Sequence, residues 1–128
     1  MNHKLLHKHL LVMAHTNESI KNEHTLKATL QDLVQHVGMK QATKPQAHYV
    51  TDPGNLGLTG TIGLMTSHAS VHMFDDGEYE GMIQFDLYSC SDFNTLSVLN
   101  FIKKRFNLSG TMFFREIDRS NFDEYDQF

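Results

Sequence analysis

Two stretches of alternating apolar and polar residues, separated by an acidic segment, most constrain how this chain can fold. The apolar positions of the first stretch are Ala69, Val71 and Met73. Those of the second are Ile83, Phe85 and Leu87. Because successive side chains of a β-strand point to opposite faces of a sheet, this period of two predicts two strands, each with one apolar face. The segment Asp75–Glu78, Asp-Asp-Gly-Glu, predicts the turn that joins them.

The opposite face of this hairpin carries the densest group of reactive side chains in the sequence. The first strand contributes His68, Ser70 and His72. The second contributes Gln84, Asp86, Tyr88 and, at its end, the single cysteine, Cys90. Just upstream, Gly57–Thr66 predicts a strand that needs backbone room at Gly60 and Gly63. We therefore interpret Gly57–Cys90 as the functional centre, with Ser67 as the reactive residue.

The rest of the chain contains both helical and strand patterns. Apolar residues three and four apart predict one helix from Asn17 to Val37, ended by Gly38. A second helix, capped by Ser91 or Asp92, is predicted to reach Phe106. Further strands are predicted at Leu10–Ala14, Ala47–Val50 and Thr111–Ile117, and a loose acidic tail at Ser120–Phe128. This order predicts an α+β two-layer sandwich, with both helices packed on one face of an antiparallel sheet.

Composition narrows the class of protein. A chain of 128 residues predicts a single domain, 1–128, which is small for an enzyme that encloses its substrate alone, so a site shared between subunits of a homodimer or higher oligomer is expected. The net charge of -4 argues against nucleic acid, and no apolar run is long enough to span a membrane. One cysteine, without an evident signal peptide, favours a reducing, cytoplasmic location.

Two familiar chemistries fit the histidine and serine residues poorly. The sequence lacks a Gly-x-Ser-x-Gly motif, and its serine and histidine are too close in sequence for a triad assembled from distant loops. His68 and His72 lie four residues apart, which on a strand separates them by about 13 Å, too far to share one ion. The sequence therefore predicts no metal site.

The run GLTGTIGLMTSHASVHMFDD, residues 57–76, followed by IQFDLYSC, residues 83–90, resembles the processing and active-site region of prokaryotic S-adenosylmethionine decarboxylases. The resemblance extends from KHLLV near the start to the segment 92–117, so it covers most of the chain. Members of this family depend on a pyruvoyl group and contribute to polyamine synthesis. The resemblance therefore implies a lyase that decarboxylates S-adenosylmethionine to supply aminopropyl groups for spermidine.

The resemblance also implies roles for individual residues. Self-cleavage between Thr66 and Ser67 would give a β chain of residues 1–66 and an α chain of residues 67–128. The new N-terminus would carry a pyruvoyl group derived from Ser67, which forms a Schiff base with the substrate amine. His72 would serve processing with support from Ser70, and Cys90 would donate a proton to the product. His68, Asp76 and Tyr49 are the candidates for substrate binding, although Asp76 also fits a solvated turn and Tyr49 simple packing.

Two features of the sequence keep alternative functions open, and a third bears on the geometry of the site. The family has glutamate where this chain has Thr66, whose β-branch would crowd the carbonyl; a non-catalytic homologue acting as a binding or regulatory subunit is therefore one alternative. The residues around Phe74–Glu78 also differ from the family, which leaves a pyruvoyl-dependent arginine or ornithine decarboxylase as the other. Finally, Ser67 and His72 are five apart and would face opposite ways in an unbroken strand, so a kink or bulge near Thr66–Ser67 is expected if they meet.

Overall fold

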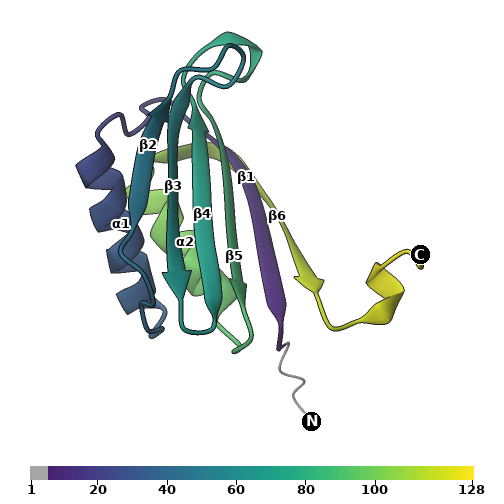
Figure 1. The fold of residues 1–128 in the computed structure, drawn as a ribbon. Helices are drawn as coiled ribbons and strands as arrows, with labels where there is room; N and C mark the ends of the chain where they lie inside the picture. Colours follow the sequence, from purple (N-terminus) through teal and green to yellow (C-terminus); the bar gives the residue numbers. More distant parts are fainter. Residues whose placement is uncertain (1–5) are drawn as a thin grey trace.

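A computed structural model describes residues 6–128 of the chain, in which six strands form one sheet and two α-helices pack against it (Figure 1). The elements follow the order β1 Lys8–Thr16, α1 Glu23–His36, β2 Gln46–Val50, β3 Gly57–Leu64, β4 Ser67–Phe74, β5 Met82–Ser89, α2 Thr95–Arg105 and β6 Leu108–Asp118. Short 3-10 turns at Gly77–Tyr79 and Phe122–Glu124 complete the structure. The strand order is β2-β3-β4-β5-β1-β6, with every neighbouring pair antiparallel. The predicted fold class is confirmed.

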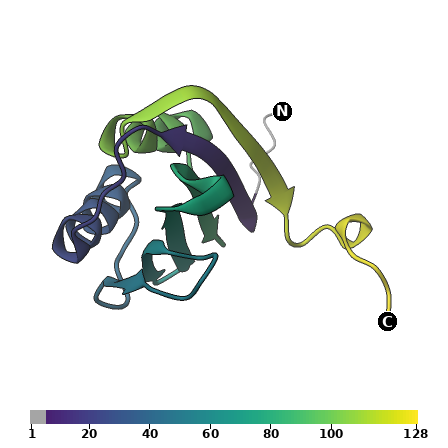
Figure 2. The ribbon, with the colours of Figure 1, turned by 90° about the horizontal axis from the view of Figure 1, so that it is seen from above.

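Both helices cover the same face of the sheet, which curves around them (Figure 2). The apolar residues that alternate along the strands point into this layer, as the period of two predicts. The largest fully buried apolar side chains are Leu10, Leu26, Leu30, Leu33, Leu58, Ile62, Met73, Ile83, Leu87, Val98 and Ile102. Each such side chain contributes about 2 kcal/mol through removal of its apolar surface from water. The core therefore lies between the helices and one face of the sheet, which leaves the other face free.

Helix α1 begins six residues later than the periodicity predicts. The side chain of Asn22 accepts a hydrogen bond from the Thr25 N–H at 3.0 Å and caps the first turn at that point. At the other end Gly38, with φ +73°, and Met39 close a Schellman motif, because their N–H groups donate to the carbonyls of Gln35 and Val34. The cap residues, rather than the apolar stripe, therefore decide where the helix starts and stops.

Helix α2 and strand β6 also differ from the predicted boundaries. Asn94, not Ser91 or Asp92, caps α2 by accepting a hydrogen bond from the Ser97 N–H at 3.0 Å. Strand β6 extends beyond Thr111–Ile117 in both directions because it pairs with β1 along most of its length. In the described residues 6–128, neither helix is long and apolar enough to cross a membrane.

The hairpin of β3 and β4 positions the predicted reactive segment. Its strands pair without interruption, from Gly57 opposite Phe74 to Leu64 opposite Ser67. Met65 and Thr66 therefore form a two-residue turn. A Cβ at Gly60 would lie 2.6 Å from Leu26 Cδ2 of α1, so any larger residue would displace that buried side chain. A Cβ at Gly63 would lie 2.8 Å from the Thr43 hydroxyl. The predicted need for backbone room at both glycines is confirmed.

The uncovered face of the sheet, which we call the open face, carries both polar and apolar side chains. A groove of about 640 Å³ crosses its centre. Polar residues along the groove include Thr59, Thr61, Ser70, His72, Gln84, Asp86 and Arg115. Among its apolar residues Leu11, Met13 and Phe113 are between 38% and 57% exposed. The open face thus combines a recess for a small molecule with unusually exposed apolar surface.

Candidate functional site

Ser67 is the first residue of β4, directly after the turn, and lies beside the only thiol. Its hydroxyl oxygen is 3.8 Å from Cys90 Sγ, and the Tyr88 hydroxyl is 3.6 Å from the same sulfur. The two segments meet because Ser67 pairs with Ser89 across β4 and β5, which places Cys90 immediately beyond the pair. Cys90 is exposed, so a molecule from solvent can reach the thiol. The structure therefore brings together the predicted reactive serine and the predicted proton donor.

The peptide bond before Ser67 is held by two hydrogen bonds from the end of β5. The Cys90 N–H donates to the Thr66 carbonyl oxygen at 3.1 Å. The Ser89 hydroxyl, fully buried, donates to Thr66 Oγ1 at 2.9 Å and accepts from the Ser91 N–H at 3.0 Å. An N–H aimed at a carbonyl oxygen stabilises the negative charge that develops there when a nucleophile attacks. The Thr66 carbonyl is thus both fixed and polarised next to the Ser67 hydroxyl.

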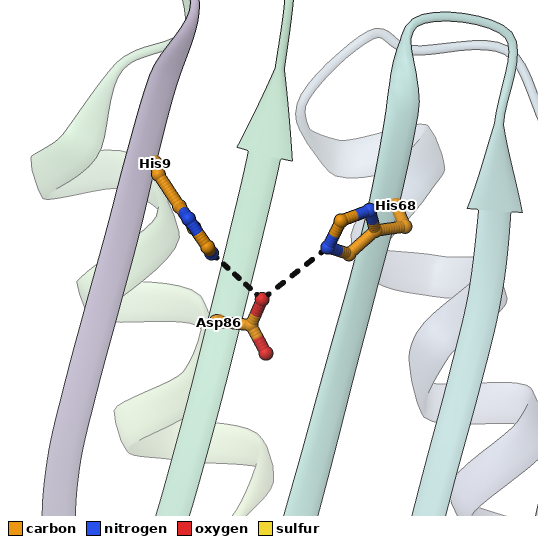
Figure 3. Close-up of side chains that lie close together, drawn as sticks. All are labelled: His9, His68 and Asp86. Atoms are coloured by element: carbon orange, nitrogen blue, oxygen red, sulfur yellow. Dashed lines mark hydrogen bonds and ion pairs between the residues drawn. The ribbon is translucent and has the colours of Figure 1, made fainter. Parts of the chain in front are cut away.

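Asp86 is the centre of the polar cluster on the open face (Figure 3). Its Oδ2 lies 2.8 Å from His9 Nε2 and 3.5 Å from His68 Nε2. Its Oδ1 accepts a hydrogen bond from the Ser70 hydroxyl. The carboxylate therefore joins three strands, since His9 lies on β1, Asp86 on β5, and His68 and Ser70 on β4.

His72 occupies the other half of β4, on the wall of the groove. Its Nε2 is buried and has no hydrogen-bond partner in the described part of the chain. Burial lowers the pKa of the imidazole, and a hydrogen bond to the backbone of Asn55 opposes that shift in part. The Phe74 ring packs edge-on against it, with centroids 4.4 Å apart. His72 is therefore held as a neutral imidazole with one nitrogen free to take up a proton.

Ser67 and His72 do not meet within one chain. The pairing of β4 with β3 and β5 continues in register past both residues, so the expected bulge is absent, although the backbone of Ser67 itself has a positive φ of 159°. Five residues of strand separate Ser67 and His72 by about 16 Å. Ser70, the predicted support for His72, instead donates to Asp86. The structure thus divides the predicted processing residues between the two ends of β4.

Of the three residues predicted to bind substrate, only His68 lies on the open face near Ser67. Tyr49 is on the edge strand β2 opposite the buried Leu58, so it faces the helices, and its hydroxyl donates to Asp75 Oδ2 at 2.6 Å. That hydrogen bond is the largest cause of the raised pKa of Tyr49. Asp76 is exposed at the start of the 3-10 turn Gly77–Tyr79. Within one chain, Tyr49 and Asp76 therefore contribute nothing to the surroundings of Ser67.

Sequence reasoning missed three residues that the structure adds to the site: His9, Asp86 and Ser89. The alternation of β5 already placed Asp86 on the polar face, but pairing partners cannot be deduced from one strand. His9 comes from the N-terminal strand, far from the motif, and only the strand order brings it beside β5. The same alternation predicts that Ser89 faces the core, and a buried position gives no reason to assign the residue a role.

The fold is that of an adenosylmethionine decarboxylase: the solved structure of this enzyme from Aquifex aeolicus VF5 matches with a TM-score of 0.70 at 18% identity, over 98% of this chain and 99% of that one. Comparison with curated protein sequences finds no match. The profile of the S-adenosylmethionine decarboxylase family matches residues 8–120. The chain therefore belongs to the S-adenosylmethionine decarboxylase family and is a decarboxylase.

Proposed function

We propose that the chain decarboxylates S-adenosylmethionine with a pyruvoyl group that it makes from Ser67, after cleaving itself between Thr66 and Ser67. One observation carries the proposal beyond family membership: the Cys90 N–H donates to the Thr66 carbonyl beside the Ser67 hydroxyl and the Cys90 thiol. The hydrogen bond from the Ser89 hydroxyl to Thr66 Oγ1 supports a role for threonine at the position where the family has glutamate. The residues present therefore fit the group.

The cleavage can be written with residues of this region. The Ser67 oxygen attacks the Thr66 carbonyl carbon, and the Cys90 N–H stabilises the oxygen that becomes negative. Transfer of the acyl group from the Ser67 nitrogen to its oxygen turns the amide into an ester. Loss of the Ser67 Cα proton then breaks the ester C–O bond and releases Thr66 as a carboxylate. The new end takes up water and loses ammonia, which leaves the pyruvoyl group.

Residues of this chain surround the position that a pyruvoyl group at Ser67 would occupy and could assist decarboxylation there. A pyruvoyl carbonyl condenses with a substrate amine and accepts the electrons released when carbon dioxide departs. The Cys90 thiol lies beside Ser67 and is exposed, so it is placed to donate a proton to the substrate carbon. The groove on the open face begins three residues further along β4, at Ser70, and offers both apolar and polar walls to the remainder of the substrate.

A second copy of the chain completes the site in this proposal. Cleavage needs a base for the Ser67 proton, and the neutral, unpartnered nitrogen of His72 suits that task, but His72 lies at the far end of its own strand. The exposed Leu11, Met13 and Phe113 on the open face support burial of this face against another subunit. Two copies related by two-fold symmetry, face to face, would bring His72 of each toward Ser67 of the other.

The product would supply aminopropyl groups for spermidine synthesis, and we place the reaction in the cytoplasm because the free thiol of Cys90 persists in a reducing compartment. These two assignments rest on the family and on the single cysteine, respectively.

Intact mass spectrometry of freshly purified protein tests the cleavage. We expect two fragments, 1–66 and 67–128, the second lighter than its sequence mass by one ammonia. Ser67→Ala should leave one uncut chain, whereas Ser120→Ala, an exposed serine on the tail, should be cut like the wild type. An uncut wild-type chain that still decarboxylates would contradict the proposal. Carbon dioxide release from S-adenosylmethionine, arginine and ornithine in parallel then identifies the substrate.

A further inference from the structure

We propose that His9, His68 and Asp86 form a binding site for a divalent transition-metal ion that prefers imidazole, with Zn²⁺ as its representative. The three side chains each offer one ligand atom, and all three atoms lie within 4.8 Å of one another (Figure 3). Two histidines and one carboxylate are a common ligand set for zinc and for other transition metals, and they leave positions open for water. The inference does not rest on self-cleavage or on the pyruvoyl group.

The register of the sheet brings the ligands together. Tyr88 of β5 pairs with His9 on one side and with His68 on the other, so the two histidines flank the same residue. Asp86 lies two residues along β5 on the same face, and both imidazoles lean toward it (Figure 3). His68 and His72 are too far apart for one ion, but a partner on another strand removes that obstacle.

The distances suit an ion after small movements of the rings. Four ligands at about 2.0–2.1 Å from a tetrahedral zinc ion lie about 3.3 Å from one another. The separations from Asp86 Oδ2 are 2.8 Å to His9 Nε2 and 3.5 Å to His68 Nε2, which bracket that value. The ligand atoms of the two histidines lie within 4.8 Å of each other, so rotations of the side chains that bring them up to about 1.5 Å closer would accommodate the ion.

The surroundings hold the ligands while leaving the site open to solvent. The Ser70 hydroxyl donates to Asp86 Oδ1, which orients the carboxylate and leaves Oδ2 toward the histidines. The Tyr88 ring packs against both imidazoles, with centroids 5.7 Å and 5.9 Å away. The His68 side chain is 46% exposed, so an ion can enter directly from water. The guanidinium carbon of Arg119 lies 4.0 Å from the centroid of the Tyr88 ring, and its positive charge opposes binding of a cation.

The experiment is titration of the full chain with Zn²⁺ in a buffer that does not bind the metal. We expect one tight equivalent at neutral pH in the wild type, and at least tenfold weaker binding in His9→Ala and in Asp86→Asn. His24→Ala, an exposed histidine on α1, is the matched control and should bind like the wild type.

A spectroscopic measurement keeps the proposal testable even where a variant folds poorly. In the wild-type chain, the imidazole nitrogen resonances of His9 and His68 should shift together on addition of one equivalent of Zn²⁺, before those of His24. Equal zinc affinity in the wild type, His9→Ala and Asp86→Asn would overturn the proposal, as would a titration in which the His9 and His68 resonances do not move. The cluster would then be a hydrogen-bonded group only.

Discussion

The two ends of strand β4 differ in what they hold. At its start, the Thr66–Ser67 bond is surrounded by hydrogen-bond donors and by a thiol, and the carbonyl to be attacked already accepts a hydrogen bond. Toward its end, His72 has a lowered pKa and a buried nitrogen that has no hydrogen-bond partner among residues 6–128. In the proposed reaction, the first end holds the bond to be cleaved and its stabilising groups, and the second end holds the base.

This difference shows that the predicted processing residues do not come together within one chain. A regular antiparallel sheet cannot bring residues five apart on one strand into contact, and the pairing of β4 is regular. In our proposal the groups that complement each other meet between two copies, through the open face that carries the exposed apolar residues. The following predictions, in order of decreasing expected effect, test this division.

Complementation gives the largest effect. Ser67→Ala and His72→Ala chains should each remain uncut when expressed alone. Expressed together, they should yield cleavage of the His72→Ala chain, up to about half of its copies in a randomly mixed dimer, because its intact Ser67 meets His72 of the other variant. Mass spectrometry distinguishes the two chains.

Coexpression of His72→Ala with a Ser67→Ala, His72→Ala double variant provides the control and should give no cleavage. Cleavage in that mixture, or none in the first, would show that the two ends of β4 do not cooperate between subunits. Circular dichroism of each variant checks that loss of the half-buried imidazole leaves the fold intact.

Removal of the Ser89 hydroxyl should produce an intermediate effect. Ser89→Ala takes away the donor to Thr66 Oγ1, and we expect cleavage to slow about tenfold, equivalent to about 1.4 kcal/mol in activation free energy. Thr66→Val removes the same hydrogen bond from its other side, and Thr66→Ser retains it. In time courses of cleavage, Thr66→Val should be cut about as slowly as Ser89→Ala, and Thr66→Ser about as fast as the wild type. A wild-type cleavage rate in Ser89→Ala would show that the hydrogen bond from Ser89 to Thr66 does not assist cleavage.

The pH dependence of stability should show the smallest effect. Burial lowers the pKa of His72, so the unfolded chain, with a pKa of about 6.5, binds a proton more readily than the folded one. The contribution of a neutral His72 is thus complete above about pH 6.5 and is lost as the pH falls toward the folded pKa. Urea midpoints should fall less on acidification in His72→Gln than in the wild type. Equal losses in both proteins would contradict a buried neutral imidazole.

The parts of the fold that follow from short-range patterns could be predicted from the sequence. Alternation of apolar residues predicts β4 and β5, and the need for glycine at Gly60 follows from the strand pattern around it. The start of α1 was predicted too early because the capping hydrogen bond of Asn22 outweighs an apolar stripe that begins sooner. Boundaries therefore depend on local hydrogen bonds that periodicity does not reveal.

The candidate site could be predicted only where its residues lie close together in the sequence. Ser67 and Cys90 belong to one motif, and the register of β4 and β5 brings them together. His9 joins the cluster through the placement of β1 beside β5, a long-range pairing that no local pattern specifies. Tyr49, by contrast, is a candidate only through the family resemblance, and the pairing of β2 turns it toward the helices.

The two-residue turn at Met65–Thr66 has a consequence for how a cut protein would come apart. A break after Thr66 leaves β1, α1, β2 and β3 on one piece and β4, β5, α2 and β6 on the other. Strand β1 lies between β5 and β6, and β3 lies beside β4, so three strand pairings would bridge the pieces. Unfolding of the cut protein would then include dissociation of two polypeptides, whereas unfolding of the uncut chain is unimolecular. The midpoint of the unfolding transition of the cut protein would therefore rise with protein concentration.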